Sequence, residues 1–177
     1  MVNVPNFSHV VNIKIRKAKY KMENVKIKKL YNNSKIPIKM HDYDAGFDIM
    51  AHLPSDMFCE IEGNKINGIM INPGETVIVG SGISVDIPKG YYLAIYSRSG
   101  LSSKRGVGLA NSVGIIDCNY HDEIMLPLYN HGTQSQIIRH NDRVAQCMLM
   151  PIIDTKFIEV DHFDTEDRGG GLGSTGI

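Results

Sequence analysis

Apolar and polar residues alternate along most of the chain in short runs, and extended helical periodicity is nearly absent. The runs are rich in Val, Ile and Tyr and are separated by turn residues such as Pro, Gly and Asn. They occupy residues 75–87, 90–96, 113–117, 123–130, 136–140 and 143–153. Many short strands at roughly ten-residue spacing predict an antiparallel β-sandwich or barrel. The single helical pattern is a short helix within residues 102–106.

Three segments of the chain differ in composition. Residues 1–21 contain no Asp or Glu and hold the basic cluster KIRKAKYK, so we interpret them as an appended N-terminal extension, mobile or loosely docked. An extra edge strand and a targeting segment are the alternatives. The strand pattern fills residues 22–163. Residues 164–177 form a glycine-rich C-terminal arm, which we expect to be flexible until a ligand orders it.

Charge and cysteine content narrow the classes of partner. Nineteen basic residues balance nineteen acidic ones, so we expect no stable nucleic-acid binding and no membrane attachment, although a local cluster can bind a small anion. No apolar run approaches the roughly 20 residues that span a bilayer. Cys59, Cys118 and Cys147 lack metal-binding spacing. We expect them to be reduced, as in the cytoplasm or another intracellular compartment.

The stretch YSRSGLSSKRG, residues 96–106, follows a predicted strand and opens a turn. Arg98, Ser99 and Gly100 bring together a guanidinium, a hydroxyl and backbone N–H groups, a combination that suits a phosphate group. An arginine in a turn is more often simply solvated, so this motif by itself is weak.

Two further stretches offer polar groups to the same kind of ligand. In RVAQ, residues 143–146, we interpret Arg143 as an ion-pair residue, with Asp142 or an acid on another strand as its partner. Gln146 in the same strand can reach a phosphate oxygen. Near the end of the chain Arg168 precedes several glycines and Ser174, and glycine lets the backbone approach a polyphosphate closely. A tail of this composition can also be a plain linker.

The stretch NSVGIIDCNY, residues 111–120, places an amide, a carboxylate and an aromatic ring between apolar runs. It is either a β-hairpin with an ordinary polar turn or part of a pocket. As a pocket, the hairpin would present free backbone groups and Asn111 to a planar base and Tyr120 to a sugar. Asp117 would then lie at the mouth of the hairpin as a base for a water molecule.

Five stretches taken together favour the pocket. AGFDIMA (45–51), YSRSGLSSKRG (96–106), NSVGIIDCNYHDEI (111–124), NDRVAQ (141–146) and RGGGLGSTG (168–176) resemble, in sequence and spacing, the motifs of the trimeric dUTPases. The resemblance implies a jelly-roll-like β-sandwich or distorted barrel that forms a homotrimer with shared active sites. It also implies hydrolysis of dUTP to dUMP and pyrophosphate, with Mg²⁺ held by the triphosphate. That reaction keeps uracil out of DNA and supplies dUMP for thymidylate synthesis.

The same resemblance assigns roles to individual residues. It implies that Asp117 deprotonates the attacking water, that Tyr120 covers the deoxyribose, and that Asp48 acts through a metal-bound water or a structural hydrogen bond. The residues implied to contact the base are Asn111, Gly114, Ile115, Ile116 and Met125. The residues implied to contact the phosphates or to close the site are Arg98, Ser99, Gly100, Gln146, Arg168, Leu172, Gly173 and Ser174.

Several positions depart from the family pattern. Leu172 replaces the phenylalanine that stacks on uracil, and its spacing from Arg168 is one residue shorter than usual. Tyr129 is a candidate for the missing aromatic ring. Asp122 and Asn141 replace glycines, and we expect Asn141 to tolerate a left-handed backbone.

Two alternative functions remain on sequence grounds. A dCTP deaminase-like enzyme shares the fold and the trimer, although the pattern of residues 116–120 and the GSTG ending favour a dUTPase. A dUTPase with an added protein-binding, regulatory role is the second alternative, with residues 56–72 as the candidate surface. We interpret that segment as a surface loop with two strand ends.

Overall fold

The computed structural model describes residues 22–167 and 169, so the N-terminal extension and most of the glycine-rich arm lie outside the described residues. The described chain consists of short strands and one helix, α1 (Ser99–Arg105). The strands are β1 (Lys26–Lys29), β2 (Phe47–Met50), β3 (Phe58–Ile61), β4 (Asn64–Asn67), β5 (Ile69–Ile71), β6 (Thr76–Gly80), β7 (Ile83–Asp86), β8 (Tyr91–Ser97), β9 (Val107–Leu109), β10 (Val113–Ile116), β11 (Met125–Asn130), β12 (Gln136–Ile138) and β13 (Arg143–Pro151).

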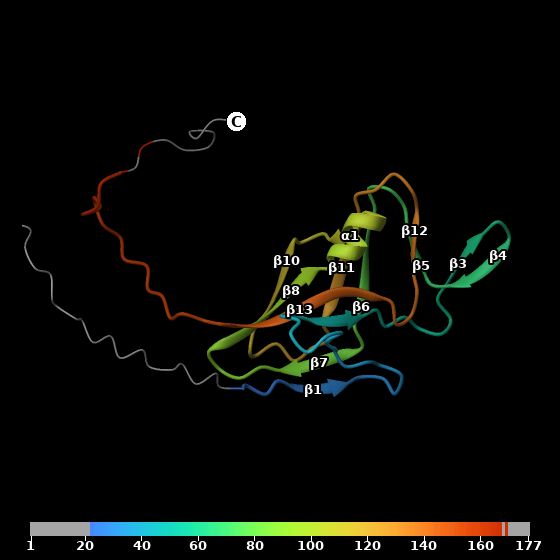
Figure 1. Ribbon diagram of the computed structural model, residues 1–177, viewed down its shortest axis with the longest axis horizontal. Helices are drawn as coiled ribbons and strands as arrows, with labels where there is room; N and C mark the ends of the chain where they lie inside the picture. Colours follow the sequence, from blue (N-terminus) through green and yellow to red (C-terminus); the bar gives the residue numbers. More distant parts are fainter. Residues whose placement is uncertain (1–21, 168, 170–177) are drawn as a thin grey trace, which may run out of the picture.

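The strands of the described chain pair antiparallel, and this confirms the all-β fold predicted from the sequence. A four-stranded sheet has the order β10-β8-β13-β2, and a three-stranded sheet has the order β6-β11-β9. The pairs β1–β7, β5–β12 and β3–β4 complete the arrangement, a jelly-roll-like sandwich (Figure 1).

The core lies between the sheets and follows the alternation seen in the sequence. In β11, Leu126, Leu128 and Asn130 are buried, whereas the residues between them remain accessible. Isoleucines and leucines from both sheets supply most of the largest fully buried side chains. The cores of such sandwiches are close-packed, so the strands hold fixed positions.

One long ladder places the segments that matter for function. β8 pairs with β13 from Tyr91 opposite Pro151 to Ser97 opposite Ala145. The end of β8 at Ser97 leads directly into the RSG turn, and it therefore lies beside the start of β13. Two motifs almost fifty residues apart in sequence thus become neighbours.

The predicted helix is present, but it begins at Ser99 rather than at residue 102. Arg98 keeps an extended backbone, with φ −85° and ψ 126°. The helix ends at Arg105 because Gly106 adopts the left-handed conformation, with φ 66°, which its missing Cβ permits. Ser99 and Gly100 therefore lie in the first helical turn, whose N–H groups have no partner within the helix.

Residues 56–72 form more than the predicted surface loop with two strand ends. Strands β3 and β4 make a complete hairpin that projects from the body of the sandwich (Figure 1). Glu62 and Gly63 form its turn with φ of 50° and 77°, the sign that a tight two-residue hairpin turn requires. The prediction was wrong because the Glu62-Gly63 pair permits a tight turn, which the pattern of apolar residues does not indicate.

After β13 the chain leaves the sandwich as an extended segment, residues 152–167, without further strands (Figure 1). Its large apolar side chains face solvent, since Ile153, Phe157 and Phe163 are 85%, 96% and 83% exposed. Among the described residues no helix has the length and apolar character needed to span a membrane.

Asn130 offers a test of how the core is held. Its Nδ2 donates to the carbonyls of Ile71 (2.9 Å) and Gln134 (2.8 Å), and its Oδ1 accepts from Gly132 N (2.9 Å). The side chain is fully buried. Asn130→Ala should lower the free energy of unfolding by about 2–4 kcal/mol, because it leaves the Ile71 carbonyl and the Gly132 N–H without their partner. Each unsatisfied buried group costs roughly 1–3 kcal/mol.

Urea denaturation at one fixed protein concentration measures this loss. The matched control is Asn64→Ala, on the exposed hairpin strand β4, which should change stability by less than about 0.5 kcal/mol. Equal effects of the two substitutions would contradict a structural role for the Asn130 amide.

Candidate active site

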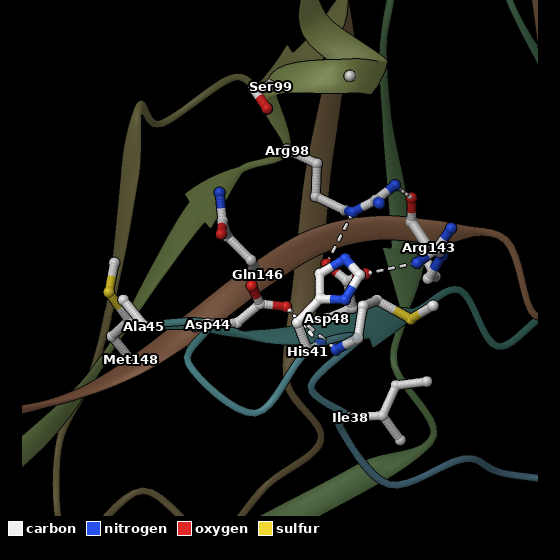
Figure 2. Close-up of a pocket in the computed structure, with 13 residues that line it drawn as sticks. Ile38, His41, Asp44, Ala45, Asp48, Arg98, Ser99, Arg143, Gln146 and Met148 are labelled. Carbon is white, nitrogen blue, oxygen red and sulfur yellow. Dashed lines mark hydrogen bonds and ion pairs between the residues drawn. The ribbon is translucent and has the colours of Figure 1, made fainter.

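An open pocket of about 510 Å³ lies where β2, β13 and the start of α1 meet (Figure 2). Its walls come from the segment that leads into β2, from the RSG turn and from β13. The lining residues are Ile38, Met40, His41, Asp44, Ala45, Gly46, Asp48, Arg98, Ser99, Gly100, Arg143, Gln146 and Met148. The pocket thus combines three of the five sequence motifs.

A single carboxylate orders the cationic wall of this pocket. Asp48 Oδ1 accepts from Arg98 Nε at 2.8 Å, and Asp48 Oδ2 accepts from Arg143 Nη1 at 3.0 Å. Arg98 Nη1 also donates to the carbonyl of Arg143 at 2.9 Å. The partner of Arg143 is therefore an acid on another strand, β2, as one of the two sequence hypotheses held. Most N–H donors of both guanidiniums remain available to a ligand.

The neutral donors of the pocket come from the RSG turn and from Gln146. The first helical hydrogen bond runs from Ser102 N to Arg98 O, so the amides of Ser99 and Gly100 precede it. Gln146 is fixed because its Nε2 donates to Ser97 O at 2.9 Å. A Cβ on Gly46 would stand 3.1 Å from Gln146 Oε1, which explains the glycine in AGFD.

The pocket provides anion contacts rather than a protein-built metal site. Within residues 22–167 and 169, no three His, Cys, Asp or Glu side chains come close enough to hold a metal ion. Both oxygens of Asp48 already accept from guanidinium groups. Cys147 lies nearby, but burial and the Asp48 charge raise the pKa of its thiol to about 12, so it stays protonated.

The stretch 111–120 differs from the hairpin that the sequence predicted. Strand β10 pairs with β8, whereas β11 pairs with β6 and β9, and no ladder joins β10 to β11 in the described chain. The two strands belong to different sheets, and the loop of residues 117–124 connects them. Because β10 pairs with β8 at the edge of the four-stranded sheet, it does not form a hairpin with β11.

A small cavity of about 90 Å³ lies between the diverging strands. Its lining includes all five residues that the resemblance assigned to the base, together with core residues of β8 to β11; the five are Asn111, Gly114, Ile115, Ile116 and Met125. β10 is the edge strand of its sheet, so its outward backbone groups have no strand partner and are free to bond a ligand, whereas on the β11 side Pro127 O accepts from Ala110 N at 2.8 Å.

The loop between these strands carries Asp117 and Tyr120. Asp117 is exposed directly after β10, and its carbonyl accepts from Tyr120 N at 3.1 Å. The Tyr120 hydroxyl donates to Glu123 O at 2.9 Å. The Glu123 carboxylate in turn accepts from Gly82 N at 2.6 Å, which ties the loop to the turn after β6.

The departures from the family pattern in this region are tolerated locally. Asn141 has a φ of 67°, which confirms the expected left-handed conformation. Asp122 is not among the described residues with a positive φ, so a side chain fits where relatives have glycine. Tyr129 packs edge-on against His131 with ring centroids 4.6 Å apart and does not line the base cavity.

Two groups of predicted site residues line separate cavities with no shared residue, one around Asp48 and one between β10 and β11, and Asp117 and Tyr120 line neither of these cavities. The arm residues Arg168, Leu172, Gly173 and Ser174 lie outside the described residues. Sequence reasoning missed His41 and Asp44, which line the first pocket. Their position just before AGFD was the only available signal.

Comparisons with known proteins identify the family of this chain. A profile of the dUTPase family matches residues 32–176. The deoxyuridine 5'-triphosphate nucleotidohydrolase of Nautilia profundicola is 36% identical over 153 residues, covering 86% of this chain and 98% of that protein. The corresponding protein of Alkaliphilus metalliredigens is 35% identical over 157 residues, covering 88% and 99%.

Solved structures share the fold at lower identity. A Staphylococcus bacteriophage 80alpha dUTPase with dUpNHpp has a TM-score of 0.72 and 23% identity, covering 88% of this chain and 100% of that one. The dUTPase from phage phi11 of S. aureus has a TM-score of 0.66 and 22% identity, covering 81% and 100%. On the profile match and the two curated relatives, the chain belongs to the dUTPase family.

Proposed function

We propose that this protein hydrolyses dUTP to dUMP and pyrophosphate in active sites that copies of the chain build together. The observation that carries the proposal is the separation of the phosphate pocket from the base cavity on one chain. Each half-site is chemically suited to one part of a nucleotide and incomplete for the other. A second copy that brings its base cavity and Asp117 to the phosphate pocket of the first copy completes the set of groups that the reaction needs.

The base cavity supports a preference for uracil. The outward backbone groups of the edge strand β10 and Asn111 can pair with the N3–H donor and O4 acceptor of uracil, where cytosine has the reverse order. A wrong base would leave buried groups unpaired, at a cost of roughly 1–3 kcal/mol for each.

The phosphate pocket supports positioning and charge neutralisation of the triphosphate. Phosphoryl transfer needs these more than covalent help from the protein. Arg98, Arg143 and the amides of Ser99 and Gly100 bind phosphate oxygens, and Arg168 with Ser174 adds contacts from the arm. Asp117 accepts a proton from the water that attacks the α-phosphorus.

Mg²⁺ fits this site as part of the substrate complex. Magnesium is commonly bound by substrate phosphates and keeps several waters, and the described residues provide no protein cage for it. When bound it neutralises charge on the phosphate oxygens. Asp48 is committed to two arginines, so its role is to hold them and at most to accept from a metal-bound water.

The C-terminal segment supports a homotrimer. Residues 152–167 extend from the sandwich with apolar side chains exposed, an arrangement that costs free energy unless another copy covers it (Figure 1). A closed ring of three copies lets each arm reach a site on a neighbour. The free thiols of the described cysteines fit a reducing, intracellular compartment.

The first prediction concerns the proposed general base. Asp117→Asn should preserve the fold and nucleotide binding but lower kcat by roughly 10²–10⁴-fold, because the amide cannot accept the water proton. Pyrophosphate release from dUTP measures the effect. Incubation with dCTP, in which ammonia release is measured, tests for deamination. The matched control is Asp122→Asn in the same exposed loop, which should keep wild-type turnover. Near wild-type kcat for Asp117→Asn would remove Asp117 from the mechanism.

The second prediction concerns sugar selection. Tyr120→Ala should narrow the ratio of kcat/KM between dUTP and UTP, because the ring is proposed to occupy the space that a 2′-hydroxyl would need. Tyr120→Phe keeps the ring and should keep most of the discrimination. If the ratio is the same in all three proteins, the selection against ribose lies elsewhere.

The third prediction concerns the arm. A chain that ends at Asp167 should keep the wild-type elution volume in size-exclusion chromatography but lose most turnover, because it lacks the phosphate contacts of Arg168 and Ser174. Steady-state kinetics with dUTP and Mg²⁺ provide the measurement. Full activity in the shortened protein would mean that the arm is only a linker.

A further inference from the structure

The charged side chains that the described residues bring to the phosphate pocket balance each other. Its charged side chains, apart from His41, are the two guanidiniums of Arg98 and Arg143 and the two carboxylates of Asp44 and Asp48. The formal charges of these four groups cancel. A triphosphate carries several negative charges, and its oxygens form their strongest hydrogen bonds with cationic or N–H donors. A further donor on the pocket wall would therefore strengthen binding.

His41 occupies that wall. The short loop before β2 is held by Asp44, whose Oδ2 accepts from His41 N at 2.9 Å and from Met40 N at 3.2 Å. Asp44 N closes the loop by donating to His41 O at 3.1 Å. These bonds fix the backbone, and the imidazole of His41 lines the same pocket as the two arginines (Figure 2).

The ring of His41 has unused hydrogen-bonding capacity. In the described part of the chain, neither ring nitrogen of His41 makes a hydrogen bond or an ion pair. By contrast, His52 Nε2 bonds Asn33 Oδ1 at 3.0 Å, and His140 Nδ1 accepts from Leu53 N at 3.2 Å. A histidine carries at least one ring N–H in either protonation state. His41 thus presents a free donor to a pocket built for an anion.

We propose that His41 is a further substrate-binding residue whose ring N–H donates to the β- or γ-phosphate of the bound nucleotide. The inference rests on the proposed function and adds a contact to its phosphate pocket. The α-phosphate must lie next to Asp117, which belongs to the other half-site, so the pocket around Asp48 holds the pyrophosphate portion. His41 is therefore specific for nucleotides that still carry that portion.

The test compares ligands with and without the pyrophosphate portion. His41→Ala should weaken binding of dUpNHpp about tenfold, the value expected for one hydrogen bond to a charged group. Binding of dUMP should be unchanged within twofold. In steady-state kinetics with dUTP, KM should rise while kcat stays similar, as for a contact made equally in the ground and transition states.

Two further variants make the result specific to the ring N–H. His41→Gln retains an N–H donor and should recover part of the lost affinity. Tyr43 lies on the same loop but is fully exposed and does not line the pocket. The Tyr43→Ala variant should therefore bind dUpNHpp like the wild type. Unfolding midpoints of all variants, measured at one protein concentration, should agree with the wild type.

Inorganic triphosphate separates this inference from the proposed function. If the wild type fails to hydrolyse dUTP but binds triphosphate about tenfold more tightly than His41→Ala, the proposed function is overturned and the phosphate-binding role of His41 is supported. If His41→Ala binds dUpNHpp and triphosphate as tightly as the wild type, His41 is only an exposed loop residue. An equal loss for dUMP and dUpNHpp would also overturn the assignment to the pyrophosphate portion.

Discussion

The carboxylate of Asp48 is the constraint on which the phosphate pocket depends. Two guanidiniums this close repel each other, and only a shared anion lets both stay in place before substrate arrives. Asp48 supplies that anion from β2, with bonds of 2.8 Å to Arg98 and 3.0 Å to Arg143. The pocket is therefore preorganised, because the two guanidiniums need not rearrange before their remaining donors bind a ligand.

The divergence of β10 and β11 has a comparable consequence for the base. A closed β10–β11 hairpin would pair the facing backbone groups of the two strands with each other, so those groups could not bond a ligand placed between the strands. Because each strand joins a different sheet, the outer side of β10 remains an unpaired edge beside a cavity of about 90 Å³. Asp117 is not among the residues that line the pocket around Asp48 on the same chain. Assembly is thus the proposed condition for a complete site.

The departures from the family pattern lie where the structure can absorb them. Asn141 takes the left-handed conformation of the glycine that it replaces, which asparagine adopts more readily than other residues. The loop around Tyr120 is held by Glu123 and Gly82 rather than by a special turn at Asp122. Cys147 is buried with its thiol protonated and contributes packing rather than chemistry.

The sequence by itself indicated the all-β class, because alternation and turn residues are local signals, whereas the candidate site residues came from the resemblance to the dUTPase motifs. The tertiary structure alone decided the start of the helix at Ser99, the partner of Arg143 and the separation of β10 from β11. It also brought His41 to the pocket wall. These features depend on which distant segments pack together, and local patterns do not specify that choice.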